Sequence, residues 1–242
     1  MIVVITLVLA AIAVVSPLWD RSGDTVLRLA RVWSQMLMRI SGVALTVEVA
    51  RPLDAGRPYV FMANHLSAAD IPSLFVAVPF PVRMIAKKSL GYIPVFGWAM
   101  HAGRFIFINR QNPIAARRSI DEAARRIHAG HSVLLFPEGT RSRDGYLGPF
   151  KKGGFHLAIA SGAEIVPCGI RGTREVLPPK HPFVRRGAIT VRLGAPIATA
   201  GMTDDDRDAL LERVRALIVE MTGQPPRPEA PPAEVSKSPA TA

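Results

Sequence analysis

Two side chains capable of acid–base chemistry lie in residues 64–70, Asn-His-Leu-Ser-Ala-Ala-Asp, directly after an apolar run. His65 and Asp70 are five positions apart, so in a regular helix they would point to different faces, because helical neighbours lie three or four positions apart. They can meet across the start of a helix, which Pro72 favours because proline is tolerated in a first turn. Asp70 would then hold the imidazole in one tautomer, leaving the other ring nitrogen able to take a proton from a hydroxyl. On the spacing alone, a helix-capping Asp70 beside an incidental His65 is the more common outcome.

The second polar segment is Phe136 to Ser142, Phe-Pro-Glu-Gly-Thr-Arg-Ser, which follows the apolar run 133–135. Gly139 allows a ligand to approach the backbone closely, and Thr140 adds a hydroxyl. Arg141 offers a planar fork that matches the oxygens of a phosphate, and Glu138 is placed to orient that arginine. The segment therefore predicts an anion site. The alternative is a simple turn with an exposed arginine.

The charge of the chain also indicates an anionic partner. Thirty Lys and Arg against 19 Asp and Glu give a formal net charge of +11. Nucleic acid is disfavoured, because only three Tyr and three Trp are present and no strip of alternating aromatic and basic residues occurs. An anionic membrane surface or a phosphate substrate fits better. Lys151 and Lys152, just before Gly153, can supply cationic and amide donors to that phosphate or form a solvated basic face.

Residues 1–40 are predicted to be a membrane-anchoring unit. No charged residue occurs from Ile2 to Trp19, a length at the lower edge of a membrane span. Residues 21–40 then form an amphipathic pattern with arginines at positions 21, 28, 31 and 39, which suits a lipid interface. Arginines that all follow the apolar run predict a body on the cytoplasmic side of the inner membrane. A monotopic helix pair would give the same pattern, and a cleaved signal is disfavoured because no Lys or Arg precedes the run.

Residues 41–223 alternate short apolar runs with amphipathic helices, which predicts a single α/β domain with a mixed, mainly parallel sheet flanked by helices. The predicted strands are 45–49, 59–63, 83–86, 105–108, 133–136, 164–170 and 188–193. One helix is predicted from the cap Asn112 to Ala129, and another from the cap Thr203 to the stop at Gly223. Residues 224–242 are rich in proline and small residues and predict a disordered tail.

Taken together, four blocks in order resemble the glycerolipid acyltransferase family, and within it the bacterial 1-acylglycerol-3-phosphate acyltransferases. The first is the His65–Asp70 block and the third is residues 136–142. The second block ends in Phe-Ile-Asn-Arg at 107–110, where the family has Asp in place of Asn109 and one residue fewer after Gly103. The fourth block is Ile-Val-Pro at 165–167, and the resemblance extends from about residue 59 to 170.

The resemblance implies that His65 is a general base and that Asp70 orients it. It also implies that five residues bind the glycerol phosphate: Arg110, Glu138, Gly139, Thr140 and Arg141. Asn64 and Lys151 are further candidate substrate-binding residues. The apolar segment Leu90 to Met100 is a candidate lining for the acyl chain, with ordinary core as the alternative.

The implied reaction moves a fatty acyl chain from acyl carrier protein or coenzyme A to the sn-2 hydroxyl of lysophosphatidic acid, giving phosphatidic acid. No metal or other cofactor is demanded. Direct transfer is favoured because neither Ser67 nor Cys168 sits in a nucleophile elbow, and Cys168 is expected to be a small buried side chain. A single cysteine also excludes an internal disulfide framework. The alternatives are a lyso-ornithine lipid or glycerol 3-phosphate as acceptor, or a non-catalytic basic membrane adaptor.

Overall fold

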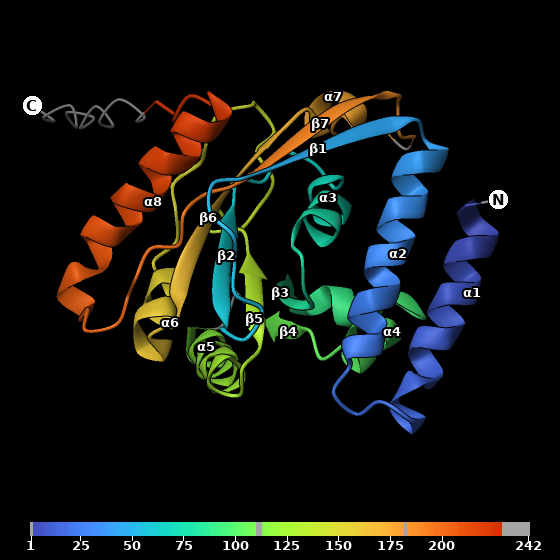
Figure 1. The fold of residues 1–242 in the computed structure, drawn as a ribbon, viewed down its shortest axis with the longest axis horizontal. Helices are drawn as coiled ribbons and strands as arrows, with labels where there is room; N and C mark the ends of the chain where they lie inside the picture. The colour runs from blue at the N-terminus through green and yellow to red at the C-terminus, as the bar shows by residue number, and fades with distance from the viewer. Residues whose placement is uncertain (1, 110–112, 182, 229–242) are drawn as a thin grey trace, which may run out of the picture.

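One seven-stranded sheet runs through the protein, as seen in the computed structural model, which describes residues 2–109, 113–181 and 183–228 (Figure 1). Its strands are β1 Val43–Val49, β2 Tyr59–Ala63, β3 Val82–Lys87, β4 Ile106–Ile108, β5 Ser132–Leu135, β6 Glu164–Arg171 and β7 Gly187–Leu193. The strand order is β1-β7-β6-β2-β5-β3-β4. Of the pairs formed by the described strands, β6 and β7 alone run antiparallel. The predicted mixed, mainly parallel α/β domain is confirmed.

Helices cover both faces of the sheet. The helical elements are α1 Ile2–Val15, η1 Ser16–Leu18, α2 Asp24–Ile40, α3 Asp70–Ala77, η2 Lys88–Tyr92, α4 Phe96–Ala102, α5 Pro113–His128, α6 Gly153–Ser161, α7 Thr173–Val176, η3 Asp204–Asp206 and α8 Arg207–Thr222. Helices α5, α6 and α8 enclose one hydrophobic core, whereas α2, α3 and α4 enclose the other. Figure 1 shows these two groups on opposite sides of the central strands.

The position of β2 at the centre of the sheet explains why its sequence is apolar at every position. Every residue of Tyr59–Ala63 is buried. Because successive side chains of a strand point to opposite faces, Val60 and Met62 enter the core under α5, α6 and α8, while Phe61 enters the other core. A strand covered on both faces gains from burying all its side chains.

The predicted strands are all present, with ends displaced by one or two residues. The predicted cap at Thr203 is confirmed, because Thr203 and Asp206 form a reciprocal capping box at the start of η3, and η3 continues directly into α8 at Arg207. Gly223 ends α8 with a left-handed φ of 64°, which glycine adopts without steric cost. Helix α5 ends at His128, close to the predicted stop, whereas the predicted cap at Asn112 lies outside the described residues.

The N-terminal region differs from the predicted separate unit. Helix α1 has 14 residues, and none of the helices that the structure describes has both the length and the apolarity needed to cross a bilayer. Helix α2 is packed into the domain, since Leu27 and Met38 belong to its core. Asp24 of α2 also pairs at 2.9 Å with Arg83 of β3, whose side chain is only 2% exposed. The boundary predicted at residue 40 therefore cuts through packed structure.

The beginning of the predicted tail is also packed. Gln224 is buried, and Pro226 forms an isolated parallel bridge with Leu147 of the loop that precedes α6. The prediction of disorder is therefore wrong for these first residues, because their backbone groups have partners in the domain. Residues 229–242 of the predicted tail lie outside the described part of the chain.

Candidate active site

The two polar blocks meet because they follow neighbouring parallel strands. β2 pairs with β5, with Met62 opposite Leu135, and both strands end at the same edge of the sheet. The residues after β2 and after β5 are therefore delivered to one place, as at the carboxyl ends of other open α/β sheets. The backbone N–H of Ser142 donates to the carbonyl of His65 at 2.8 Å, which ties the two blocks together.

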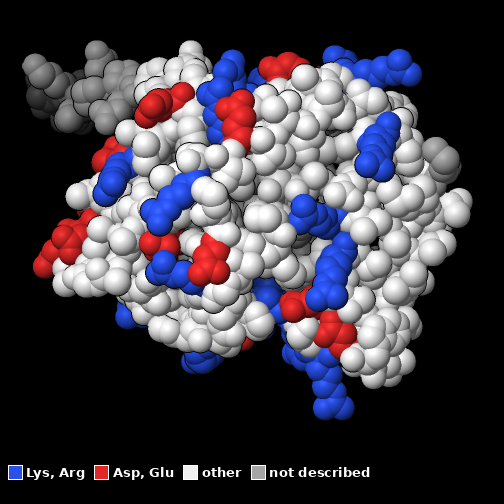
Figure 2. Space-filling view, viewed as in Figure 1, with Lys and Arg blue, Asp and Glu red and all other residues white. Residues whose placement is uncertain are grey.

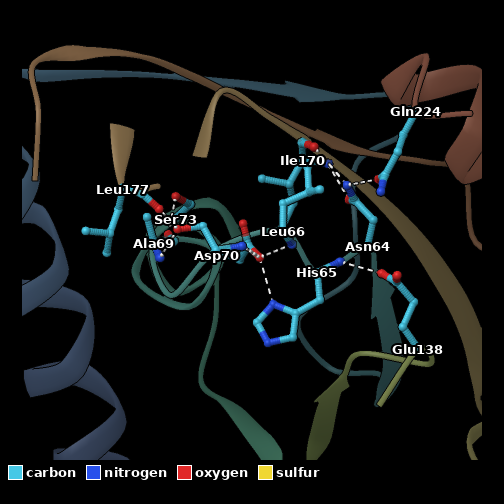
Figure 3. Close-up of polar contacts among 11 residues, drawn as sticks. Asn64, His65, Leu66, Ala69, Asp70, Ser73, Glu138, Ile170, Leu177 and Gln224 are labelled. Atoms are coloured by element: carbon cyan, nitrogen blue, oxygen red, sulfur yellow. Dashed lines mark hydrogen bonds and ion pairs between the residues drawn. The ribbon is translucent and has the colours of Figure 1, made fainter. Parts of the chain in front are cut away.

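The carboxylate of Asp70 is aimed at the turn that precedes α3 (Figure 3). Its Oδ2 accepts hydrogen bonds from His65 Nδ1 at 2.7 Å and from the backbone N–H groups of Leu66 at 2.7 Å and Ser67 at 2.9 Å. Asp70 is the first residue of α3, is fully buried and does not cap that helix with its side chain. The alternative of a helix-capping Asp beside an incidental His is therefore wrong.

His65 presents its second ring nitrogen away from Asp70. Because a carboxylate oxygen only accepts, we assign the imidazole proton to Nδ1, which leaves Nε2 with a lone pair. Nε2 has no hydrogen-bond partner among the residues described, and the side chain is 14% exposed. The Phe136 ring stacks on the imidazole with centroids 3.8 Å apart and planes 12° apart. Phe136 belongs to the third block, but no sequence pattern indicates that its ring stacks on a histidine.

Glu138 supports the backbone of His65 and does not orient Arg141 as predicted. Its Oε1 accepts the backbone N–H of His65 at 2.7 Å, and its Oε2 accepts the backbone N–H of Gly148 at 2.9 Å. Burial raises the pKa of Glu138 to about 7, against the lowering effect of these two N–H donors. Both oxygens of Glu138 are therefore engaged by backbone N–H groups of the protein.

Asn64 was predicted to bind substrate, but the structure gives its side chain a different task. It is fully buried, and its Oδ1 accepts the backbone N–H of Ile170 at 2.8 Å. Its Nδ2 donates to the Ile170 carbonyl at 3.0 Å and to Gln224 Oε1 at 2.9 Å. Asn64 therefore fixes the start of the first block against β6.

A cleft of about 440 Å³ is lined in part by Phe136, the ring that stacks on the imidazole of His65. Its floor is apolar and is formed by Ile85, Ile108, Ile120, Leu135 and Phe136. Its rim carries four basic side chains, Arg117, Lys151, Lys152 and Arg207, and one acidic side chain, Asp204, which lies 3.9 Å from Arg207. An apolar floor with a cationic rim fits a molecule that has a hydrocarbon chain and a negatively charged group.

Gly139 and Lys151 connect the third block to this cleft. Gly139 has a left-handed φ of 75°, and a Cβ there would approach Lys151 Cε at 3.0 Å, so the lysine side chain lies across the glycine. Thr140 and Arg141 are exposed on the adjoining loop. Neither Arg141's guanidinium nor its backbone N–H has a hydrogen-bond partner within the described residues. Arg110, another predicted anion ligand, lies outside the described residues.

The two possible nucleophiles are inaccessible. The Ser67 hydroxyl is buried and donates to the Leu177 carbonyl at 2.7 Å. Cys168 is fully buried in β6, as expected, and burial raises the pKa of its thiol well above the usual range. Neither group can attack a substrate in this arrangement.

The segment Leu90 to Met100 does not form an enclosed slot. Leu90 and Met100 pack on the core, but Phe96 and Trp98 are more than half exposed on the surface beside α1. The prediction that this segment lines the acyl-chain slot is therefore wrong for its aromatic residues. From sequence alone, an apolar side chain at the surface cannot be distinguished from one in the core, so the exposure of Phe96 and Trp98 could not be predicted.

The chain is similar in sequence to known proteins. A family model described as Acyltransferase matches residues 44–171. The chain is 36% identical over 169 residues to a 1-acyl-sn-glycerol-3-phosphate acyltransferase of Saccharomyces cerevisiae, covering 69% of this chain and 56% of the yeast protein. It is 34% identical over 172 residues to a human 1-acyl-sn-glycerol-3-phosphate acyltransferase beta, covering 71% and 62%. The matched region is thus less than two thirds of either relative.

A solved structure is similar over nearly its whole length. It is the crystal structure of the 1-acyl-sn-glycerophosphate acyltransferase PlsC from Thermotoga maritima, with a TM-score of 0.71 and 25% sequence identity. The alignment covers 90% of this chain and 95% of that one. The family model matches only residues 44–171. Because the structural alignment covers 90% of the chain, the likeness extends well beyond those residues.

Proposed function

We propose that this chain, which belongs to the acyltransferase family, transfers a fatty acyl chain from a thioester to the sn-2 hydroxyl of 1-acylglycerol 3-phosphate, giving phosphatidic acid. The observation that carries the proposal is the dyad. His65 has one ring nitrogen bonded to buried Asp70 and the other directed away from it beside a cleft that suits a lipid phosphate. An adaptor that works by charge alone would not need this geometry.

In the proposed reaction, His65 Nε2 takes the proton of the acceptor hydroxyl as its oxygen attacks the thioester carbonyl. The carbonyl π electrons move to oxygen and give a tetrahedral intermediate. Collapse of this intermediate re-forms the carbonyl, breaks the carbon–sulfur bond and expels the thiolate. The imidazolium of His65 then returns its proton to the thiolate or to water. Asp70 stabilises the imidazolium through the 2.7 Å bond to Nδ1.

Two features make further catalytic groups unnecessary. A thiol has a pKa of about 8.5, so the thiolate leaves without strong help from a general acid. The backbone N–H groups of Thr140 and Arg141 have no hydrogen-bond partner among the described residues, and we propose that they donate to the oxyanion of the intermediate. The proposed reaction therefore uses no metal or other cofactor, only the acyl thioester as co-substrate.

Arg141 and Lys151 are the proposed ligands of the acceptor phosphate. Arg141 is exposed on the loop joined to His65 through Ser142, and Lys151 lies on the cleft rim next to Gly139. A guanidinium fork and a lysine ammonium together suit the nearly doubly charged phosphomonoester. Glu138 and Asn64 do not contact the substrate in this proposal. Glu138 accepts the backbone N–H of His65, and Asn64 bonds the backbone of Ile170 in β6.

We propose that the protein is bound to a membrane surface, with the catalytic domain facing the cytoplasm. The exposed apolar side chains of α1 include Val3, Val4, Leu7 and Val8, each more than half exposed. Helix α4 contacts α1 and adds Phe96 and other exposed side chains. Figure 2 shows only uncharged residues where α1 lies, at the right-hand edge of this face. We propose that this surface enters one leaflet, while the basic surface attracts anionic headgroups.

A panel of acceptors tests the proposed activity. Purified protein is mixed with lysophosphatidic acid, a lyso-ornithine lipid or glycerol 3-phosphate, each with an acyl carrier protein thioester and with an acyl coenzyme A. We expect kcat/KM to be highest for lysophosphatidic acid with at least one donor. Faster acylation of either other acceptor would reassign the substrate, and no transfer to any acceptor would overturn the proposed activity.

A further inference from the structure

Residues 224–227, which we name the C-terminal strap, follow Gly223 at the end of α8 and contact the loop 142–148. The backbone N–H of Leu147 donates to the Pro225 carbonyl at 2.8 Å, and the N–H of Arg227 donates to the Leu147 carbonyl at 2.9 Å. The Arg227 guanidinium also bonds Asp144 of the same loop at 3.1 Å. The strap and the loop are therefore joined at three points.

The loop beneath the strap holds the main chain of His65. Its Ser142 N–H donates to the His65 carbonyl at 2.8 Å. Its Gly148 N–H donates to Glu138, and the other oxygen of Glu138 accepts the His65 N–H at 2.7 Å. Both backbone polar groups of His65 thus depend on the segment that the strap covers.

Gln224 reaches the first block directly, which gives the strap a second route to His65. Its side chain is 7% exposed, and its Oε1 accepts Asn64 Nδ2 at 2.9 Å across 160 positions of sequence. Figure 3 shows this side chain entering beside Ile170, on the far side of Asn64 from the imidazole. Gln224 Nε2 has no hydrogen-bond partner among the described atoms. The bond from Asn64 is therefore the hydrogen bond that compensates for burying the Gln224 amide.

We propose that the strap positions His65 for acyl transfer, with Gln224 and Arg227 as positioning residues. This inference rests on the proposed function of His65. Neither residue lines the cleft, so their effect should fall on turnover and not on acceptor binding. The imidazole follows its backbone, and a misplacement of about 1 Å can slow a reaction by roughly a hundredfold.

Two shortened chains give a matched test. One ends at Arg227 and keeps the strap, and the other ends at Gly223 and lacks it. We expect the chain ending at Arg227 to match the full chain. The chain ending at Gly223 should lose roughly ten- to a hundredfold in kcat, with KM for lysophosphatidic acid within about twofold. Activities are measured well below each chain's Tm and divided by the folded fraction, so a merely structural role would leave kcat unchanged.

Point variants in the full chain cover the case in which the chain ending at Gly223 fails to fold. Gln224→Met keeps the volume but removes the acceptor for Asn64, and it should lower kcat. Gln224→Glu keeps an acceptor oxygen and should recover part of that loss. Arg227→Ala should lower kcat through the loop 142–148. Equal kcat for wild type, Gln224→Met and Arg227→Ala would overturn the proposal.

Amide hydrogen exchange separates failure of this inference from failure of the proposed function. The N–H groups of His65 and Ser142 are both bonded in the structure, so they should exchange faster when the strap is removed or Gln224 is changed to Met. If the full chain acylates nothing, the proposed function falls and exchange alone decides on the strap. Unchanged exchange at both amides would then overturn the strap as well.

Discussion

Replacing Asp70 with asparagine isolates the electrostatic part of the dyad. All three donors, His65 Nδ1 and the N–H groups of Leu66 and Ser67, converge on Oδ2 of Asp70. Oδ1 is buried and has no hydrogen-bond partner within the described residues. An asparagine can therefore place its carbonyl oxygen at the Oδ2 position and keep all three bonds. What it loses is the negative charge.

The size of the effect follows from the charge that His65 acquires. The charge centres of a carboxylate and an imidazolium in such a contact lie about 4 Å apart, which corresponds to about 4 kcal/mol at an effective dielectric constant near 20. This stabilisation exists only once the proton has moved to His65, so its loss raises the barrier. We expect kcat to fall roughly a thousandfold, because about 1.4 kcal/mol is tenfold in rate. KM for the acceptor should change little, since buried Asp70 does not face the cleft.

The assay is the rate of phosphatidic acid formation from lysophosphatidic acid at saturating thioester, in wild type and Asp70→Asn. Asp121→Asn, an exposed change on α5, is the matched control and should keep the wild-type rate. The Tm of Asp70→Asn should stay within a few degrees of wild type, since the three hydrogen bonds remain. A kcat within about threefold of wild type, or a loss confined to KM, would refute the role assigned to the Asp70 charge.

Three further predictions concern the phosphate, the membrane surface and pH. Arg141→Ala should lower kcat/KM for lysophosphatidic acid roughly ten- to a hundredfold, and Arg141→Lys should recover part of it, while a phosphate-free lyso-lipid is little affected. The double change Leu7→Asp and Val8→Asp should reduce sedimentation with anionic vesicles, whereas Ile114→Asp, at an exposed apolar position on α5, should not. Because the folded pKa of Glu138 is raised to about 7, folded protein binds the extra proton, and the free energy of unfolding should fall as pH rises from about 4.5 to about 7, by up to about 1.4 kcal/mol per unit. Denaturant titrations should show this slope in wild type and a flatter one in Glu138→Gln.

Each of these three has a contrary result. Equal losses on both acceptors would make Arg141 structural. Unchanged sedimentation of the double variant at moderate salt would move membrane attachment to the rest of the surface. Equal pH slopes in wild type and Glu138→Gln would show that another group accounts for the dependence.

The sheet could be predicted from sequence because its strands are buried on both faces. Runs such as Tyr59–Ala63 are apolar at every position, which few other elements of this length would be. The meeting of His65 and Asp70 was predicted by the family resemblance, because the five-residue spacing alone favours a helix-capping aspartate beside an incidental histidine. The strand order follows from pairing over long separations, so no local pattern could supply it.

The supporting contacts of the site were not predictable, for a related reason. Gln224 and Asn64 are separated by 160 positions, and Glu138 bonds a backbone N–H that has no sequence signature. Composition also misled at the C-terminal end of the domain. A proline-rich segment is usually disordered because it has too few apolar side chains to form a core. Pro225 is nevertheless held in place, because its carbonyl oxygen accepts the backbone N–H of Leu147. Amino-acid composition does not reveal such a backbone acceptor.

The role of His65 as the base is tested by comparing wild type with His65→Ala and His65→Gln. Both variants remove the proposed base, while His65→Gln keeps a polar side chain able to hydrogen-bond Asp70. Phosphatidic acid formed from lysophosphatidic acid and an acyl thioester is quantified by mass spectrometry, with circular dichroism and vesicle sedimentation as controls for folding and membrane binding. We expect wild type to form phosphatidic acid, and both variants to stay folded and membrane-bound but to lose turnover by a factor of at least roughly a hundred. Turnover near the wild-type rate in either variant would contradict His65 as the base.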